Sequence, residues 1–338
     1  MTYPDFLIIG AQKAGTTWLH LNLQAHPGIW MPKEKELHYF DEKTKNKSSL
    51  ADRLRGERAM DQRWRRQVKR QVGRYRQNFR PRNVAWDLNY FLRPYNDEWY
   101  ASLFRQGHGR VTGEATPDYS IVGRDAVAHV REIMPEAKII FMMRNPIERA
   151  WSQVLMDHRN EPNADDMPEG ELRRRFANKR SRLLTDYLRT LENWGSFFPE
   201  EQIFVGFLED VHFYPNRLLK RLYAFLRVNT NTEYRVIRRK IHARDVETMP
   251  TAVASRLAGV YLEDARRLEE RFGGYASFWR YSAERLAEDP PAEEKIAYPL
   301  YGSPLWDEWV AQRDEGPEPG TPEGEALSGR LSSLRAAS

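Results

Sequence analysis

The sequence contains no cysteine, which excludes disulfide bonds, thiolate zinc sites and cysteine nucleophiles. It also has no run of roughly 18 to 20 apolar residues, the length that a membrane-spanning helix needs. The chain does not open on a basic stretch followed by an apolar one, so the pattern of a secretory leader is missing. These absences lead us to expect a cytoplasmic protein without a membrane span, whose chemistry comes from other side chains.

A strong excess of one charge is missing too, because 53 lysine and arginine residues stand against 48 aspartate and glutamate residues, for a net charge of +5. This modest positive charge favours an anionic ligand, but it does not separate a nucleotide from a polysaccharide or a nucleic acid. The 338 residues are 41% hydrophobic, which is enough for one large domain or two small ones with a buried core. The composition therefore indicates a globular protein.

Short apolar runs alternate with segments of helical periodicity along the chain. The predicted strands cover residues 6–9, 138–143 and 202–207, and the predicted helices cover residues 16–25, 126–134, 215–228 and 251–272, with one more helix after Pro146. Alternating strands and helices are typical of a parallel sheet with helices on both faces. We therefore predict a three-layer α/β/α fold of P-loop-like type with a central, mainly parallel sheet.

The chain divides by composition into a main domain and a C-terminal part. We predict a main domain over residues 1–282, an extension over 283–315 and a disordered tail over 316–338, where proline, glycine and glutamate dominate. The main domain contains a basic helical insertion at about residues 43–110, and we predict one long helix in its strongly basic part between Lys43 and Arg82.

A loop of small and polar residues joins the first predicted strand to the first predicted helix, and its sequence is Gly10-Ala11-Gln12-Lys13-Ala14-Gly15-Thr16-Thr17. The N-terminus of a helix binds anions through its free N–H groups and its dipole. Lys13 can add a positive charge, and the hydroxyls of Thr16 and Thr17 can cap the helix or donate to phosphate oxygens. The same residues could also form only a tight turn with a helix cap, so other segments must decide.

Arg144 ends the strand over 138–143, where a nucleoside-triphosphate enzyme usually places a magnesium-binding aspartate. Ligands of open α/β sheets bind at the carboxyl ends of strands, so Arg144 and the small-residue loop should face one crevice. Ser152, on the following helix, could donate a second hydrogen bond to an anion held by Arg144. By itself, an arginine in this place is often a surface ion pair.

These segments resemble the sulfotransferase superfamily over about residues 4–280. The loop from Lys13 to Thr17 is similar to its 5′-phosphosulfate loop, and the segment Arg144-Asn145-Pro146 through Arg149 and Ser152 is similar to its 3′-phosphate motif. The nearest type is that of the heparan sulfate enzymes and their bacterial relatives. The resemblance implies that 3′-phosphoadenosine 5′-phosphosulfate is the sulfate donor and that no metal is needed. The residues that the resemblance implies as contacts of this donor are Lys13, Ala14, Gly15, Thr16, Thr17, Arg144, Ser152 and, from a third loop, Arg244.

Sulfuryl transfer also needs a general base, because the acceptor hydroxyl loses a proton as it attacks. Glu36 and His38 are the candidates, and an extended segment would point both to the same side. Their segment, Lys35-Glu36-Leu37-His38-Tyr39-Phe40, resembles the E-x-H-F-F motif of the family, which implies Glu36 as the base and His38 as its partner or substitute. Lys13 would stabilise the leaving phosphate. Without the resemblance, the same charges could form a solvated edge.

Two alternatives to a sulfotransferase stay open. A P-loop kinase would read G-x-x-x-x-G-K-S/T, and here Thr16 takes the place of the lysine. A non-catalytic polyanion-binding protein would use the basic insertion, where Trp64, Tyr75 and Phe79 could stack on bases or sugars. For a sulfotransferase we expect an acceptor with a hydroxyl or amine, such as a saccharide or another anionic small molecule, and no nucleic acid.

The resemblance has one departure near the reacting group. The segment Gly113-Glu114-Ala115-Thr116-Pro117-Asp118-Tyr119 is similar to the family's E-K-S/T-x-x-Y, but Ala115 stands where the heparan sulfate enzymes place a lysine. The role of that lysine is therefore lost or supplied elsewhere.

Overall fold

The computed structural model describes residues 2–42, 50–57, 59–77, 81–157, 169–176, 178–230 and 248–312. Its centre is a five-stranded parallel sheet, and the strands in spatial order are β2 (Ile29–Trp30), β3 (Val111–Ala115), β1 (Phe6–Gly10), β4 (Lys138–Met143) and β5 (Ile203–Phe207). Strand β1 is buried along its whole length and β4 along nearly all of it, which explains their continuous apolar sequences.

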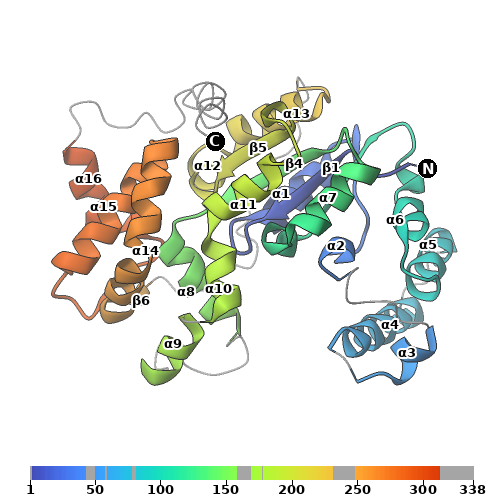
Figure 1. Cartoon of the computed structure of the whole chain (residues 1–338), viewed down its shortest axis with the longest axis horizontal. Helices are drawn as coiled ribbons and strands as arrows, with labels where there is room; N and C mark the ends of the chain where they lie inside the picture. Colours follow the sequence, from blue (N-terminus) through green and yellow to red (C-terminus); the bar gives the residue numbers. More distant parts are fainter. Residues whose placement is uncertain are drawn as a thin grey trace.

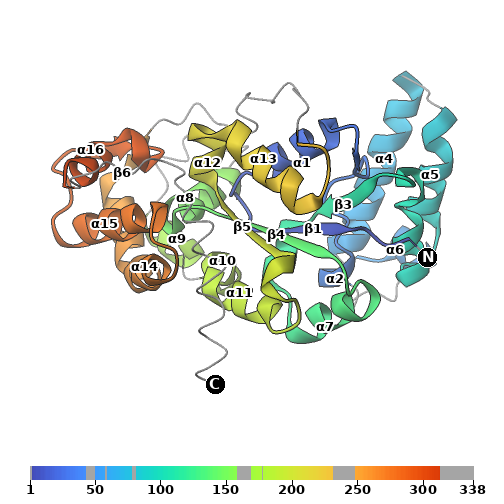
Figure 2. The ribbon, with the colours of Figure 1, turned by 90° about the horizontal axis from the view of Figure 1, so that it is seen from above.

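Helices cover both faces of this sheet (Figure 2). One face carries α1 (Thr16–Ala25), α12 (Leu208–Phe213) and α13 (Pro215–Leu226), and the other carries α7 (Arg124–Ile133) and α11 (Tyr187–Gly195). Helix α8 (Pro146–Asp157) follows β4 and leads to α9 (Glu169–Phe176) and α10 (Lys179–Thr185). The predicted three-layer α/β/α fold is therefore confirmed.

Sequence patterns did not predict β2 and β3, because neither strand has a long apolar run. Strand β2 has two residues, and β3 contains Gly113 and the buried Glu114. A Cβ atom at Gly113 would collide with the ring of Phe6 on the neighbouring strand. The glycine that weakens the strand pattern is thus required by the close packing of β3 against β1.

The described residues of the basic insertion contain four α-helices. The long helix predicted between Lys43 and Arg82 is present as α4 (Ala59–Gln77), and the shorter α3 (Leu50–Arg55), α5 (Pro81–Leu92) and α6 (Asp97–Ser102) stand with it beside the sheet in Figure 1. Trp64, Trp86 and Tyr90 are among the buried aromatic side chains that pack these helices together. Trp64 is therefore not presented on the outer surface of the insertion, while Phe79 lies outside the described residues.

The C-terminal part packs as an ordered unit on the far side of the sheet from the insertion (Figure 1). It comprises β6 (Thr248–Pro250), α14 (Thr251–Phe272), α15 (Tyr275–Glu288), β7 (Lys295–Ala297) and α16 (Pro304–Ala311). Strand β6 pairs antiparallel with β7, and α15 runs through residue 282, where we placed the end of the main domain. The domain division stays a prediction, and the tail over 316–338 lies outside the described residues.

None of the helices in the described ranges combines the length and the apolar character that crossing a membrane requires. The cytoplasmic location stays a prediction from the sequence.

Candidate functional site

The strand order indicates where the sheet should have its ligand-binding crevice. From β1 the chain moves to the β2 and β3 side of the sheet, and from β3 it crosses over to β4 on the opposite side of β1. Open α/β sheets bind their ligands where neighbouring connections leave in opposite directions, so the expected crevice lies at the carboxyl ends of these two strands. The loops are tied to the sheet there, because Ala11 N–H donates to the Met142 carbonyl at 2.6 Å and Thr116 N–H donates to the Ile8 carbonyl at 3.0 Å.

The loop after β1 has a conformation that few residues tolerate. Gly15 has a φ of +82°, and a Cβ atom there would lie 2.9 Å from Cδ1 of Leu208. Lys13 also lies in the left-handed region, with a φ of +72°. Gly15 is the N-cap of α1, so Thr16 and Thr17 are the first helical residues and do not cap the helix as the sequence suggested. The first turn of α1 contains no acidic residue, and its N–H groups form an end suited to an anion.

Arg144 connects the two predicted anion motifs. Its guanidinium donates to the Lys13 carbonyl at 3.2 Å, so the loop after β4 contacts the loop after β1 as predicted from the sheet rule. The same guanidinium donates to one carboxylate oxygen of Glu148 at 3.0 and 2.9 Å and to the Tyr298 hydroxyl at 2.7 Å. Ser152 lies on α8 with 9% of its surface exposed. Arg244 lies outside the described residues.

Arg149 serves a structural purpose rather than facing the crevice. Its side chain is fully buried and donates to Thr185, Ser181 and Gln153. Burial lowers the pKa of this arginine below its usual value. The residue therefore fastens α8 to α10 through neutral partners.

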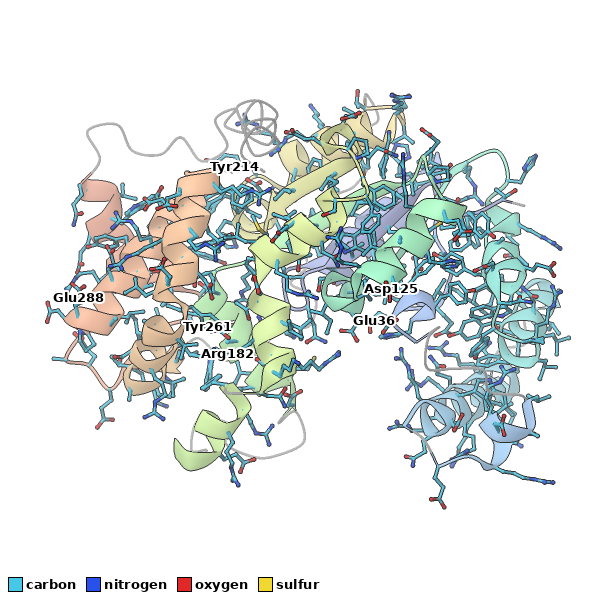
Figure 3. All side chains as sticks on the ribbon, viewed as in Figure 1. Glu36, Asp125, Arg182, Tyr214, Tyr261 and Glu288 are labelled. Atoms are coloured by element: carbon cyan, nitrogen blue, oxygen red, sulfur yellow. The ribbon has the colours of Figure 1, made fainter. Side chains whose placement is uncertain are left out.

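Glu36 and His38 lie together, but not through the extended backbone that we expected. Both residues have left-handed backbones, with φ of +65° and +56°. The expectation of an extended segment is wrong because two contacts bend it: Glu36 N–H donates to the Ala115 carbonyl at 3.1 Å, and the Tyr119 hydroxyl accepts from Tyr39 N–H at 3.0 Å. Figure 3 shows Glu36 next to α2 (Tyr39–Glu42).

The buried carboxylate of Glu114 helps to hold this bent segment in place. Glu114 on β3 accepts hydrogen bonds from the hydroxyls of Tyr100 at 2.6 Å, Thr116 at 2.8 Å and Tyr119 at 2.9 Å. Burial raises the pKa of Glu114 above its usual value. Because Tyr119 also contacts the backbone of Tyr39, Glu114 positions the segment without facing the crevice.

The pKa values of Glu36 and His38 distinguish these two candidate bases. Burial alone would raise the pKa of Glu36, but contact with His38 and the charge of Lys35 outweigh it and lower this pKa to about 2. Burial alone would lower the pKa of His38, but Asp41 and Glu36 outweigh it and raise this pKa to about 9. His38 is therefore an imidazolium at neutral pH, and Glu36 is a carboxylate.

Asp41 and Asp118 are site residues that sequence reasoning missed. His38 Nδ1 lies 2.6 Å from Asp41 and 3.8 Å from Asp118, and Glu36 lies 3.6 Å from His38 Nε2. A signal for Asp41 was present, because it follows His38 at the spacing of one helical turn. Within the described residues, the side chains of His38, Asp41 and Asp118 also lie close enough together to be ligands of one metal ion. Arg180 already pairs with Asp118 at 2.7 Å, so we interpret the group as an ion-pair network.

A pocket opens between this segment and the insertion. Glu36 and His38 line one side, and the other side is lined by Arg53, Asp61, Arg63, Trp64, Gln67, Tyr90 and Tyr95. Arg63 donates to the Glu36 carbonyl at 3.3 Å, so the insertion touches the candidate base directly. Arg65, by contrast, donates to backbone carbonyls of residues 53, 54 and 56 and holds the insertion together.

Comparisons with known proteins find sulfotransferases. A sequence model of the sulfotransferase family matches residues 4–232. The membrane-associated sulfotransferase kil1 of Dictyostelium discoideum is 28% identical over 150 residues, which are 44% of this chain and 22% of that protein. Human heparan sulfate glucosamine 3-O-sulfotransferase 3B1 is 30% identical over 134 residues, which are 36% of this chain and 33% of that protein. The match therefore spans a third or less of each relative.

Among solved structures, a sulfotransferase from Alicyclobacillus acidocaldarius is similar in fold. The TM-score is 0.54 at 22% identity, over 80% of this chain and 96% of the other. At this level of identity the likeness supports the architecture of the sheet and its flanking helices, and nothing finer.

Proposed function

Because the chain belongs to the sulfotransferase family, we propose that it moves a sulfuryl group from 3′-phosphoadenosine 5′-phosphosulfate to a hydroxyl or amine of an acceptor. The observation that carries the proposal is the hydrogen bond from Arg144 to the Lys13 carbonyl. It joins the loop suited to a 5′-phosphosulfate and the loop suited to a 3′-phosphate at one edge of the sheet.

The loop residues fit the phosphosulfate end of this donor. Gly15 has the left-handed backbone that suits glycine and is the N-cap of α1, whose first turn carries no acidic residue, so the N–H groups at this helix end suit an anion. In the proposed complex, Lys13, Ala14, Gly15, Thr16 and Thr17 hold the 5′-phosphosulfate. Arg144 and Ser152 hold the 3′-phosphate, with Arg244 as a third contact predicted from the sequence.

The proposed transfer uses Glu36 as the general base. The acceptor oxygen bonds to sulfur while the bond from sulfur to the bridging oxygen of the 5′-phosphate breaks, and the electron pair leaves with that phosphate. The acceptor proton passes to the Glu36 carboxylate. His38 cannot take it at neutral pH because its raised pKa keeps it protonated. Lys13 and the N–H groups of α1 stabilise the charge that grows on the leaving phosphate, so the residues need no metal for this step.

The pocket beside Glu36 favours an anionic acceptor, such as an acidic saccharide. Ala115 is buried and brings no charge to the site, whereas Lys35 contacts Glu36 at 2.6 Å and Arg63 lines the pocket. In the proposed complex, Arg63 pairs with an acidic group of the acceptor while the acceptor hydroxyl faces Glu36.

Replacing Arg63 by glutamate should raise KM for an anionic acceptor about tenfold or more, because a repelling charge replaces an attracting one. Initial rates with a panel of acidic and neutral acceptors measure it. Arg66→Glu is the matched control, since Arg66 lies on the same helix with an exposed side chain. Equal effects of the two variants, or an equal effect on neutral acceptors, would contradict the anionic class.

Calorimetric titration with 3′-phosphoadenosine 5′-phosphate, without metal, tests the proposed function. Wild type should bind the bisphosphate, and Arg144→Ala should weaken binding about tenfold or more, because the variant loses the charge and releases the Lys13 loop. ATP with magnesium should bind weakly or not at all. Preference for magnesium ATP would support a kinase instead, and binding of neither nucleotide would favour a polyanion-binding protein.

A further inference from the structure

The C-terminal extension reaches the candidate donor site from outside the family match, which ends at residue 232. After β7 the chain passes through Tyr298, and two residues later Leu300 N–H donates to Oε1 of Glu148 at 2.8 Å. The other oxygen of that carboxylate accepts from Arg144. Glu148, buried in the first turn of α8, therefore fastens the extension next to the arginine predicted to bind the 3′-phosphate.

Most N–H donors of Arg144 are already engaged by other residues of the protein. A guanidinium has five N–H donors. The bonds to Glu148, Lys13 and Tyr298 engage four of them within the described residues. Phosphate recognition at this place must therefore use groups that Arg144 holds, in addition to its remaining N–H.

Tyr298 is such a group. A guanidinium only donates, so the Tyr298 hydroxyl accepts at 2.7 Å and keeps its own hydrogen for another partner. No acceptor for that hydrogen is found in the described ranges. The guanidinium also lies 5.2 Å from the centre of the Tyr298 ring, which fixes the side chain, and the residue is partly exposed. A hydroxyl polarised by a cation is a strong donor toward an anion.

We infer that Tyr298 is a binding residue for the 3′-phosphate of the donor nucleotide, so that the C-terminal extension completes a site begun by the loops after β1 and β4. This inference rests on the proposed function. It assigns the extension a specificity role, because a nucleotide without a 3′-phosphate gains nothing from Tyr298.

The test compares two nucleotides in wild type and Tyr298→Phe. Phenylalanine keeps the ring over Arg144 and removes only the hydroxyl. Calorimetry with 3′-phosphoadenosine 5′-phosphate should show binding weakened about 10- to 100-fold, the loss expected for one hydrogen bond to a charged group. Adenosine 5′-phosphate, which lacks the 3′-phosphate, should bind both proteins equally. Tyr281→Phe is the control, because it removes a hydroxyl that bonds to Glu308 within the C-terminal helices.

Each other result overturns the inference in a recognisable way. Unchanged binding of the bisphosphate by Tyr298→Phe would mean that the Tyr298 hydroxyl does not contact the 3′-phosphate. Tighter binding would mean that this hydroxyl occupies space that the nucleotide needs. Equal weakening of both nucleotides, or the same loss in Tyr281→Phe, would reduce it to structural support. If wild type binds no bisphosphate, the proposed function itself fails.

Discussion

Replacing Glu36 by glutamine is expected to lower kcat about 10²- to 10⁴-fold and to leave binding of 3′-phosphoadenosine 5′-phosphate unchanged. Glutamine keeps the size and the polar character of the side chain but cannot accept the acceptor proton. The side chain is 40% exposed in the pocket, so the substitution should not unfold the protein. Single-turnover release of the bisphosphate from the labelled donor, with an acceptor active in wild type, measures the loss.

The dependence on pH distinguishes Glu36 from His38 as the base. If Glu36 is the base, the rate should be flat near neutral pH, because its carboxylate forms well below that range, with a pKa of about 2. A base at His38 would instead make the rate rise as pH approaches 9, where His38 loses its proton. A fully active Glu36→Gln with such a rise would assign the proton transfer to His38.

His38→Asn is the companion variant for this test. It removes the imidazolium that contacts Glu36 and Asp41. Because the pKa of Glu36 is held low by that contact, the variant should raise it toward the usual carboxyl range. If the fall of the rate on the acidic side of the pH profile shifts to higher pH in this variant, His38 sets the pKa of Glu36 rather than accepting the proton.

The parts of the fold that the sequence predicted are those with long, uniform patterns. Strand β4 and helices α1 and α14 have the predicted bounds, because each has a clear apolar run or periodicity and an unambiguous break at a glycine or proline. The meeting of Arg144 with the Lys13 loop also followed from the sequence, since parallel strands end at one edge.

Long-range contacts decide the features that the sequence could not predict. Strand β3 contains a glycine because the ring of Phe6 packs against it and leaves no room for a side chain. It can also contain a buried glutamate because three hydroxyl groups donate hydrogen bonds to that carboxylate. The left-handed turns at Glu36 and His38 depend on the Ala115 carbonyl and the Tyr119 hydroxyl, about 80 residues away. No local pattern contains that information.

The same reason explains why the sequence predicted no helix or strand within the C-terminal extension. Its sequence loses apolar periodicity after residue 284, yet α16 buries Leu305 and Trp309, and β7 pairs with β6. The contact of Tyr298 with Arg144 joins residues 154 positions apart. Only tertiary structure places a tyrosine from this segment beside a residue that the family motif identifies.

Replacing Lys13 by alanine is expected to lower kcat/KM for the donor about 10²- to 10³-fold, the loss typical of removing one preorganised group that stabilises developing charge. The backbone carbonyl that accepts from Arg144 is present in any residue, so the variant isolates the ammonium group. Lys13→Arg should recover part of the rate. Lys220→Ala removes one charge from an exposed position on α13 and should leave the rate unchanged.

Binding and rate should respond differently in Lys13→Ala if the lysine acts in the transition state. The dissociation constant of 3′-phosphoadenosine 5′-phosphate should increase much less than the rate falls, because the charge on the leaving phosphate is largest while the bond to sulfur breaks. Lysine and alanine both have a Cβ atom at this φ of +72°, so the variant should keep the fold, and a thermal unfolding curve checks this. Equal losses in binding and rate would mean that Lys13 only holds the nucleotide. An unchanged rate would leave the stabilisation of the leaving phosphate to the N–H groups of α1.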